Sequence, residues 1–227
     1  MKFFTLLCAA LLLFVVSNSH AQVSLGIRGG YVNAGLAVPE HSTAPGTSHQ
    51  DRWQVGTYLN IPLFKGGYLQ PGASYIVKGA NLNYISPHPD LFTSGATKLT
   101  LRYLELPVNF VYKVPVGFGK LLVGAGPYAA YCVRGDYKLE AIDAGGQVSS
   151  GSKRIDFKSS PNIFGTGMNI QRWDAGLNFT AGVELNCFLT LTGHYGYGLM
   201  NLDKSTNNLN NRYWGVSLGF IFDREDW

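Results

Sequence analysis

The chain has 227 residues and a formal net charge of +4 at pH 7, which is too small and too scattered to argue for a nucleic-acid partner. Charged residues make up 14% of it, against roughly 25% in an ordinary soluble domain, so they are too few for a soluble surface. After residue 21 no apolar run approaches the roughly 20 residues of a membrane-spanning helix, which excludes a helical membrane protein.

The first 21 residues have the features of a secretory signal peptide. Lys2 gives a positive start, and residues 3–16 carry no charge. Ser19 and Ala21 are small residues at the positions that a signal peptidase reads. The apolar stretch is also shorter than a membrane anchor. Residues 1–21 are therefore predicted to be removed on export.

Eight segments of the remaining chain alternate between apolar residues and small or polar residues, which is the period of a β-strand. In the clearest segment, residues 172–186, the odd positions are apolar from Trp173 to Leu185, and the even positions are polar or glycine. In chain order the segments are residues 23–31, 52–63, 68–81, 103–113, 120–134, 172–186, 188–200 and 213–222. This pattern predicts an all-β fold. The even number of strands is typical of bacterial outer-membrane barrels, so we predict an eight-stranded antiparallel up-and-down transmembrane β-barrel over residues 22–227.

The connections between these segments alternate in length. Short connections are predicted at residues 63–67, 114–119 and 186–187, and long ones at residues 37–50, 82–98, 136–171 and 201–211. Short periplasmic turns and long outer loops are typical of outer-membrane barrels, so both termini are expected in the periplasm. The longest loop is where a functional contact is most expected. Pro71 and Pro127 fall inside strands and predict a bulge or local irregularity.

The polar set of alternating positions is expected to face the lumen. It is rich in Gly, Ser, Thr and Asn, which would coat a soluble barrel poorly but would fill the narrow interior of eight strands. Its ionisable members are Arg28, Lys78, Glu105, Arg134, Asp174, Glu184 and His194. Both signs are present, so ion pairs are expected to offset their burial and to leave the lumen largely plugged. We expect Glu105 near Arg28. Asp174 is expected near Arg134 or Lys78.

Four segments resemble strand motifs of the PorT-like outer-membrane β-barrel family of Bacteroidota. They are Tyr103-Leu-Glu-Leu-Pro107, Val123-Gly-Ala-Gly-Pro-Tyr128, Asp174-Ala-Gly-Leu-Asn-Phe-Thr-Ala-Gly182 and Tyr195-Gly-Tyr-Gly-Leu-Met-Asn201. Their order and spacing extend the resemblance over nearly all of the chain after residue 21. It implies an eight-stranded outer-membrane barrel of mostly unassigned function, in a family whose founding member is linked to type IX protein secretion. The partners that follow are outer-membrane lipid, lipopolysaccharide and, during insertion, the barrel assembly machinery.

The sequence contains no catalytic, cofactor or metal motif of the expected spacing. His194 falls in the lumen phase, whereas an enzyme that acts on lipid needs its catalytic group on the lipid face. The loop histidines His41, His49 and His88 lack the spacing of metal ligands. Residues 124–129 match a dinucleotide-binding fingerprint formally, but no helix follows to receive a pyrophosphate. We therefore predict no catalytic residue, no cofactor and no metal.

These features predict a non-enzymatic outer-membrane barrel with a plugged lumen, acting through its extracellular loops or within an envelope complex. Lys153, Arg154 and Lys158 make the longest loop basic, which suits lipopolysaccharide phosphates, although a merely solvated loop explains them equally well. The alternatives are a narrow small-solute channel, a secretion-associated barrel and an outer-membrane enzyme. The sequence does not identify a specific protein partner.

Overall fold

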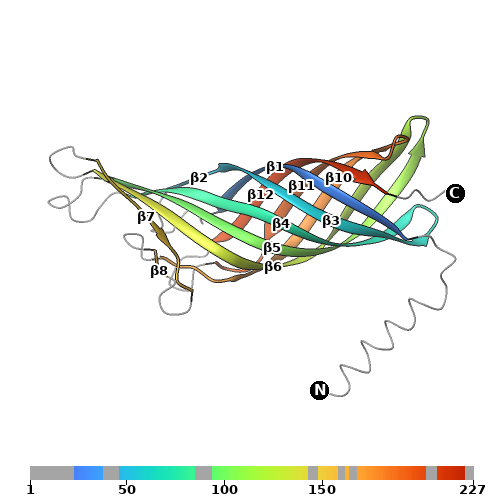
Figure 1. Cartoon of the computed structure of the whole chain (residues 1–227). Helices are drawn as coiled ribbons and strands as arrows, with labels where there is room; N and C mark the ends of the chain where they lie inside the picture. The colour runs from blue at the N-terminus through green and yellow to red at the C-terminus, as the bar shows by residue number, and fades with distance from the viewer. Residues whose placement is uncertain are drawn as a thin grey trace, which may run out of the picture.

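The computed structural model describes residues 23–37, 46–84, 94–142, 148–157, 162–163, 168–202 and 209–222. Within these ranges there is no helix with the length and hydropathy of a membrane span. The predicted signal peptide lies outside them and stays a prediction. The described chain forms one long antiparallel barrel of tilted strands (Figure 1).

Eight strands form the wall of the barrel, and each pairs antiparallel with its neighbours in sequence. They are β1 (Ser24–Ala37), β3 (Gln50–Phe64), β4 (Gly67–Tyr84), β5 (Ser94–Val116), β6 (Gly119–Ile142), β10 (Trp173–Leu185), β11 (Leu189–Gly198) and β12 (Asn210–Ile221). Pairing of β1 with β12, from Gly26↔Ile221 to Ala37↔Asn210, closes the ring. The predicted eight-stranded up-and-down barrel is confirmed.

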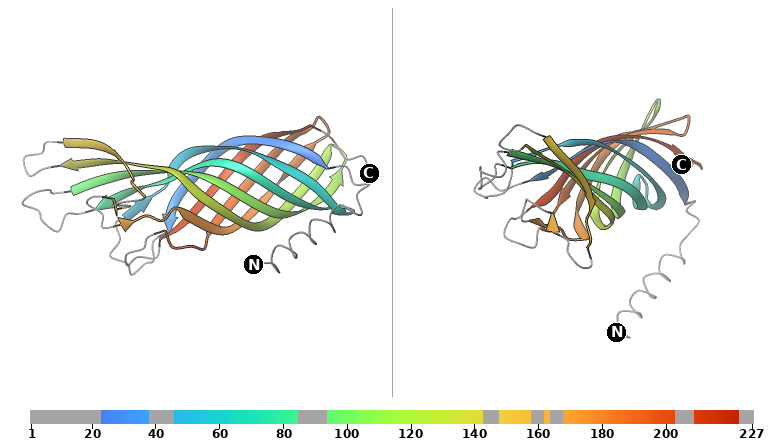
Figure 2. Two further views of the ribbon diagram at one scale, coloured as in Figure 1. Left: turned by 60° about the horizontal axis from the view of Figure 1, so that its bottom comes forward. Right: turned by 60° about the vertical axis from the view of Figure 1, so that its left-hand side comes forward.

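The strands on one side are much longer than the alternation predicted. β5 begins at Ser94 and β6 continues to Ile142, so parts of the two longest predicted loops are strand. β7 (Val148–Arg154) pairs with β6, and β2 (Gly46–Ser48) pairs with β4. We call residues 79–84, 94–101, 134–142 and 148–154 the outer extension; it projects beyond the barrel (Figure 2). The alternation failed here because Lys98 and Lys138 replace apolar residues on exposed positions while the backbone pairing continues.

The ends of the barrel differ in their connections. Short turns at residues 65–66, 117–118 and 186–188 lie at the end where β1 begins and β12 finishes (Figure 1). Gly66 in the first of these turns has a φ of 81°, a left-handed conformation that glycine adopts without steric cost. The long connections and the outer extension lie at the opposite end. A small hairpin of β8 (Asn162–Ile163) and β9 (Met168–Asn169) belongs to the longest of them.

The outside of the barrel is an apolar belt bordered by aromatic side chains. Large apolar or aromatic side chains point outward along the wall strands, with Val55, Leu106 and Leu218 at least half exposed. Tyr and Trp rings pair near the outer end, and Phe rings pair near the turn end. The outer pairs are Tyr31–Trp214, Trp53–Tyr75 and Tyr131–Trp173, and the Phe pairs are Phe64–Phe110, Phe188–Phe220 and Phe220–Phe222. Two aromatic girdles around an apolar band are the mark of a membrane-spanning barrel.

Strand irregularities occur at Pro71 and Pro127 and at two register shifts, one of which lies between Pro62 and Phe64 where β3 pairs with β4. Pairing between β4 and β5 stops at Pro71 and resumes at Ser74 in the same register, and pairing between β5 and β6 skips Pro127 in the same way. The predicted irregularity near both prolines is therefore present. The other register shift occurs where Arg102 pairs with Arg134 and Tyr103 with Cys132, which leaves Val133 as one extra residue in β6. Such a bulge reverses the side to which later residues point.

Candidate functional site

The centre of the lumen holds a buried lysine between two carboxylates. Lys78 of β4 lies with its Nζ 2.8 Å from Glu105 Oε2 on β5 and 3.4 Å from Asp174 Oδ2 on β10. All three side chains are almost completely buried. The strand period directs each of them inward, since they fall on the inner face of three different strands. Partners of opposite charge offset much of the cost of removing these charges from water.

Aromatic and amide side chains complete the shell around this lysine. The Nζ of Lys78 lies over the rings of Tyr213 and Tyr128, at 4.5 and 4.7 Å from their centroids. The Tyr213 hydroxyl is 2.8 Å from Glu105 Oε1, and Asn211 Nδ2 donates to Asp174 Oδ2 at 2.7 Å. Ring faces stabilise a cation, and the amide stabilises a carboxylate. We call these residues, with Lys78, Glu105 and Asp174, the central polar layer.

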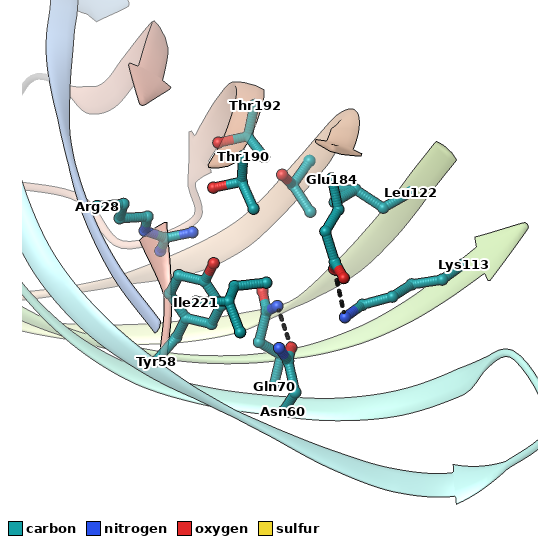
Figure 3. A pocket seen from close by; sticks show the side chains of 11 residues that line it. Arg28, Tyr58, Asn60, Gln70, Lys113, Leu122, Glu184, Thr190, Thr192 and Ile221 are labelled. Carbon is teal, nitrogen blue, oxygen red and sulfur yellow. Dashed lines mark hydrogen bonds and ion pairs between the residues drawn. The ribbon is translucent and has the colours of Figure 1, made fainter. Parts of the chain in front are cut away.

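A second polar layer lies nearer the turn end. Lys113 Nζ is 2.8 Å from Glu184 Oε2 (Figure 3). The same Nζ lies 4.4 Å from the centroid of the Tyr68 ring. Arg28 lies over the Tyr58 ring, 5.5 Å from its centroid. The space left among these side chains has a volume of only about 10 Å³. That is room for about one water molecule, so this layer fills the lumen.

The outer end of the lumen is closed by apolar side chains. Buried strand residues such as Val32, Leu99 and Leu101 pack there, and residues from the long connections join them. Those added residues are Ile155, Ile170, Leu202 and Leu209. Backbone hydrogen bonds fix the connections in place, since Leu202 N donates to Leu209 O and Gln171 N donates to Leu202 O, each at 2.8 Å. The barrel is thus sealed by an apolar layer above two polar layers.

Six of the seven ionisable residues predicted for the lumen lie on its inner side. Lys78, Glu105, Asp174 and Glu184 are buried there, and Arg28 and His194 are half-buried. The pairing differs in part from our expectation. Glu105 binds Lys78 and not Arg28, whereas Asp174 binds Lys78, one of its two expected partners.

His194 is held by hydroxyl groups. Its Nε2 is 2.9 Å from Thr192 Oγ1, and its Nδ1 is 3.4 Å from Thr180 Oγ1. Both threonines are buried on the lumen side. The ring therefore has hydrogen-bond partners at both nitrogens and faces away from the lipid.

Arg134 is the exception, and the expectation that it faces the lumen is wrong. The extra residue Val133 reverses the alternation, so Arg134 and Asp136 point outward while Gly135 and Tyr137 are buried. The side chain of Arg134 is 49% exposed, and its Nε lies 2.8 Å from Asp136 Oδ2. The prediction assumed that side chains alternate without interruption along β6, so it placed Arg134 on the wrong face of the strand.

Arg134 instead belongs to a group of arginines just beyond the outer girdle. Arg102 and Arg134 both bind Asp136, and Arg154 Nε is 3.9 Å from Asp136 Oδ1. Partial burial of Asp136 acts to raise its pKa, but the hydrogen bonds from Arg134 and Arg102 outweigh burial and lower the pKa below its usual value. Asp136 is therefore ionised at neutral pH. It holds the arginines against the wall of β6.

Arg172 closes the group on the side of β10. Its Nη1 donates to the Tyr131 hydroxyl at 2.6 Å, and its guanidinium lies 4.8 Å from the centroid of the Phe157 ring. Between these side chains is a cleft of about 670 Å³, lined by Arg134, Arg154 and Arg172 together with Val133, Ile155 and Phe157 among others. We call it the arginine cleft.

Sequence reasoning missed Lys113 and the tyrosines as members of the lumen network. Lys113 shares the inward phase of Glu105 on the same strand, so the alternation could have found it. Tyr213 and Tyr128 also fall on inward positions. Nothing in a sequence pattern, however, says that their rings meet around one lysine. As for metals, the part of the chain that the structure describes has no group of three His, Cys, Asp or Glu side chains placed to hold an ion. His41 and His88 lie outside that part.

Comparison with known proteins agrees with this architecture. A family model described as outer membrane protein beta-barrel domain matches residues 17–204. The chain belongs to this family. It is therefore a β-barrel protein of the bacterial outer membrane. No curated protein matches it at the sequence level.

Solved barrels have a similar fold at low sequence identity. Neisserial surface protein A is 11% identical with a TM-score of 0.46, over 88% of this chain and 99% of that one. OprG from Pseudomonas aeruginosa is 11% identical with a TM-score of 0.46, over 90% and 98%. Ail, the attachment invasion locus protein of Yersinia pestis, is 12% identical with a TM-score of 0.41, over 88% and 99%, in a complex with the heparin analogue sucrose octasulfate. These matches concern the fold alone.

Proposed function

We propose that this outer-membrane barrel is a non-conducting, non-enzymatic protein that acts through its outer end, within an assembly of the cell envelope. The observation that carries the proposal is the filled lumen. Among the described residues, the apolar layer and the central polar layer consist of buried side chains, and the polar layer beneath them leaves about 10 Å³. A barrel that conducts needs a water-filled interior, whereas the interior of eight strands is just wide enough for side chains to fill.

The outer extension is where such a protein would meet a partner. Four long strand segments stand beyond the belt, and β7 pairs with β6 on one side only among the residues described. Loops and strand ends held on a rigid barrel commonly carry binding functions. The position of the extension, opposite the short turns, supports an outward-facing end with both termini in the periplasm. The sequence supports residues 1–21 as a cleaved signal peptide ahead of a barrel domain of residues 22–227.

The absence of enzymatic activity is also part of the proposal. His194, the residue best suited to proton transfer in the wall, bonds to two threonines and points into the lumen. A catalytic histidine needs an acid that orients it and access to substrate. Among the described residues, the ring nitrogens of His194 bond to these two threonines and not to an acid, and the ring does not face the lipid.

The finer family relationship is proposed on the sequence motifs alone. The four segments that resemble the PorT-like family fall on β5, β6, β10 and β11, which supports a barrel of that type. A role associated with protein secretion is the second candidate. The outer extension would suit binding within a secretion complex as well as within another assembly of the cell envelope. A narrow channel is the competing function that the following experiment tests.

The experiment is single-channel recording on the purified mature protein in planar bilayers. Faster migration of the unboiled than of the boiled sample on a semi-native gel shows that the barrel is folded before it is added. We expect no stable conductance from the wild type. Stable, uniform current steps from folded protein would overturn the non-conducting function and favour the channel.

A further inference from the structure

The arginine cleft stands at the boundary between the apolar belt and the outer extension. Arg172 bonds to the hydroxyl of Tyr131, and Tyr131 pairs with Trp173 in the outer girdle at 5.0 Å between ring centroids. Val133, which lines the cleft, is 48% exposed on the lipid-facing wall. The cleft therefore begins where the girdle ends. Its lower edge is apolar and its upper edge is cationic.

The charge of the cleft is positive. The cleft and its wall contain four arginines and two carboxylates. The arginines are Arg102, Arg134, Arg154 and Arg172, and the carboxylates are those of Asp136 and Asp156. The guanidinium groups outnumber the carboxylates by two. Arg154 is held only weakly, since it is 66% exposed and 3.9 Å from Asp136.

Arg172 keeps capacity for a further acceptor. One of its nitrogens bonds to Tyr131, but its Nε is buried without a hydrogen-bond partner among the residues described. The guanidinium also lies over the Phe157 ring, whose face stabilises its charge. Arginine presents its N–H groups as a fork that matches two oxygens of a phosphate. Three arginines line the cleft, and their guanidinium groups supply donors for a tetrahedral, multiply charged anion.

We propose that the arginine cleft binds the phosphate of a phosphorylated glycolipid in the outer leaflet. The phosphate would lie among Arg134, Arg154 and Arg172, and the acyl chains would lie along Val133 and Trp173 below. A lipid fits better than a soluble anion because the cleft is continuous with the apolar belt at its lower edge. The inference rests on the outward orientation proposed above, which accessibility of a single cysteine tests independently.

The experiment is native mass spectrometry of the folded mature protein in detergent, with phosphorylated lipid A or the same lipid freed of phosphate. We expect one phosphorylated lipid to remain bound to the wild type. Arg154→Gln and Arg172→Gln should each weaken retention by about tenfold or more, since each removes a charge-assisted hydrogen bond. Lys65→Gln is the matched control, because Lys65 is an exposed cation in the turn between β3 and β4 at the opposite end. It should leave retention unchanged.

Three outcomes would overturn the proposal. Equal retention of the phosphorylated and dephosphorylated lipids would exclude recognition of phosphate. Displacement of the lipid by an equal concentration of inorganic phosphate would assign the cleft to a soluble anion. Equal loss in the Lys65→Gln variant would show attraction by overall charge and not by the cleft. A gel-shift comparison of boiled and unboiled samples confirms folding of each variant first.

Discussion

The ring of Tyr213 occupies the space in which a Cβ of residue 196 would stand. Gly196 of β11 pairs with Tyr213 of β12, and any added methyl group would overlap the ring carbons. The same ring lies against Lys78, and its hydroxyl bonds to Glu105. A glycine on one strand thus makes room for a group that stabilises the central polar layer.

Gly196→Ala is therefore expected to destabilise the barrel by about 1–3 kcal/mol, the usual cost of overpacking a tight interior. The measurement is urea unfolding in detergent, followed by tryptophan fluorescence. Gly193→Ala is the control on the same strand, because its Cβ would meet only Ala181 O at 3.7 Å. Equal effects of the two substitutions would show that Tyr213 does not depend on the space at residue 196.

Removal of the Lys78 charge should have the larger effect. In Lys78→Met two carboxylates, Glu105 and Asp174, lose the cation that lies between them. Breaking a buried ion pair on one side costs about 3–5 kcal/mol. The same urea titration measures it, and Lys65→Met is the exposed control. Adding Glu105→Gln and Asp174→Asn to Lys78→Met should recover part of the loss, and no recovery would contradict the assigned pairing.

Asp136→Asn should tighten the binding of phosphorylated glycolipid. Asp136 holds Arg102 and Arg134 and lies 3.9 Å from Arg154, so its neutralisation frees guanidinium groups for phosphate. We expect several-fold greater retention in native mass spectrometry, together with faster hydrogen exchange in the outer extension. Reduced retention with unchanged exchange would mean that Asp136 contributes to the site and does not compete with the lipid.

Cys187 offers a test of orientation. It is exposed in the turn between β10 and β11, whereas Cys132 is buried in β6. If the turns face the periplasm, a polyethylene-glycol maleimide too large for porins should label Cys187 only after the outer membrane is permeabilised. Cys187→Ser is the control for unrelated labelling. Labelling in intact cells would place the short turns outside and reverse the proposed topology.

The alternating segments predicted the fold because a membrane-spanning strand must present lipid on one face and a packed lumen on the other. Residues 172–186 show this in every position, and β10 agrees with them within one residue at each end. The inward charges followed from the same phase. The outer extension could not be predicted in this way, because Lys98 and Lys138 are exposed where a membrane-spanning strand would have apolar residues. The backbone pairing continues there without the alternation of apolar and polar residues.

The remaining differences arise from single residues and from loops. One extra residue, Val133, moved Arg134 from the expected lumen to the outer wall and formed part of the arginine cleft. No composition rule reveals a bulge of that kind. Leu202 and Leu209, which seal the lumen, lie in a segment that reads as a polar loop. Their burial depends on where the connection folds back over the strands.

The seam between β1 and β12 determines when the barrel can close. Gly26 near one end of the described chain pairs with Ile221 near the other, so this contact has the longest sequence separation of any strand pair here. Contacts of such separation form late, because ordering the intervening chain costs entropy before the pairing is gained. Every earlier hairpin can form from its own neighbours, yet β1 and β11 both keep an open edge until β12 arrives and pairs with both. A partly synthesised chain therefore has two unpaired edges that must be protected during transit.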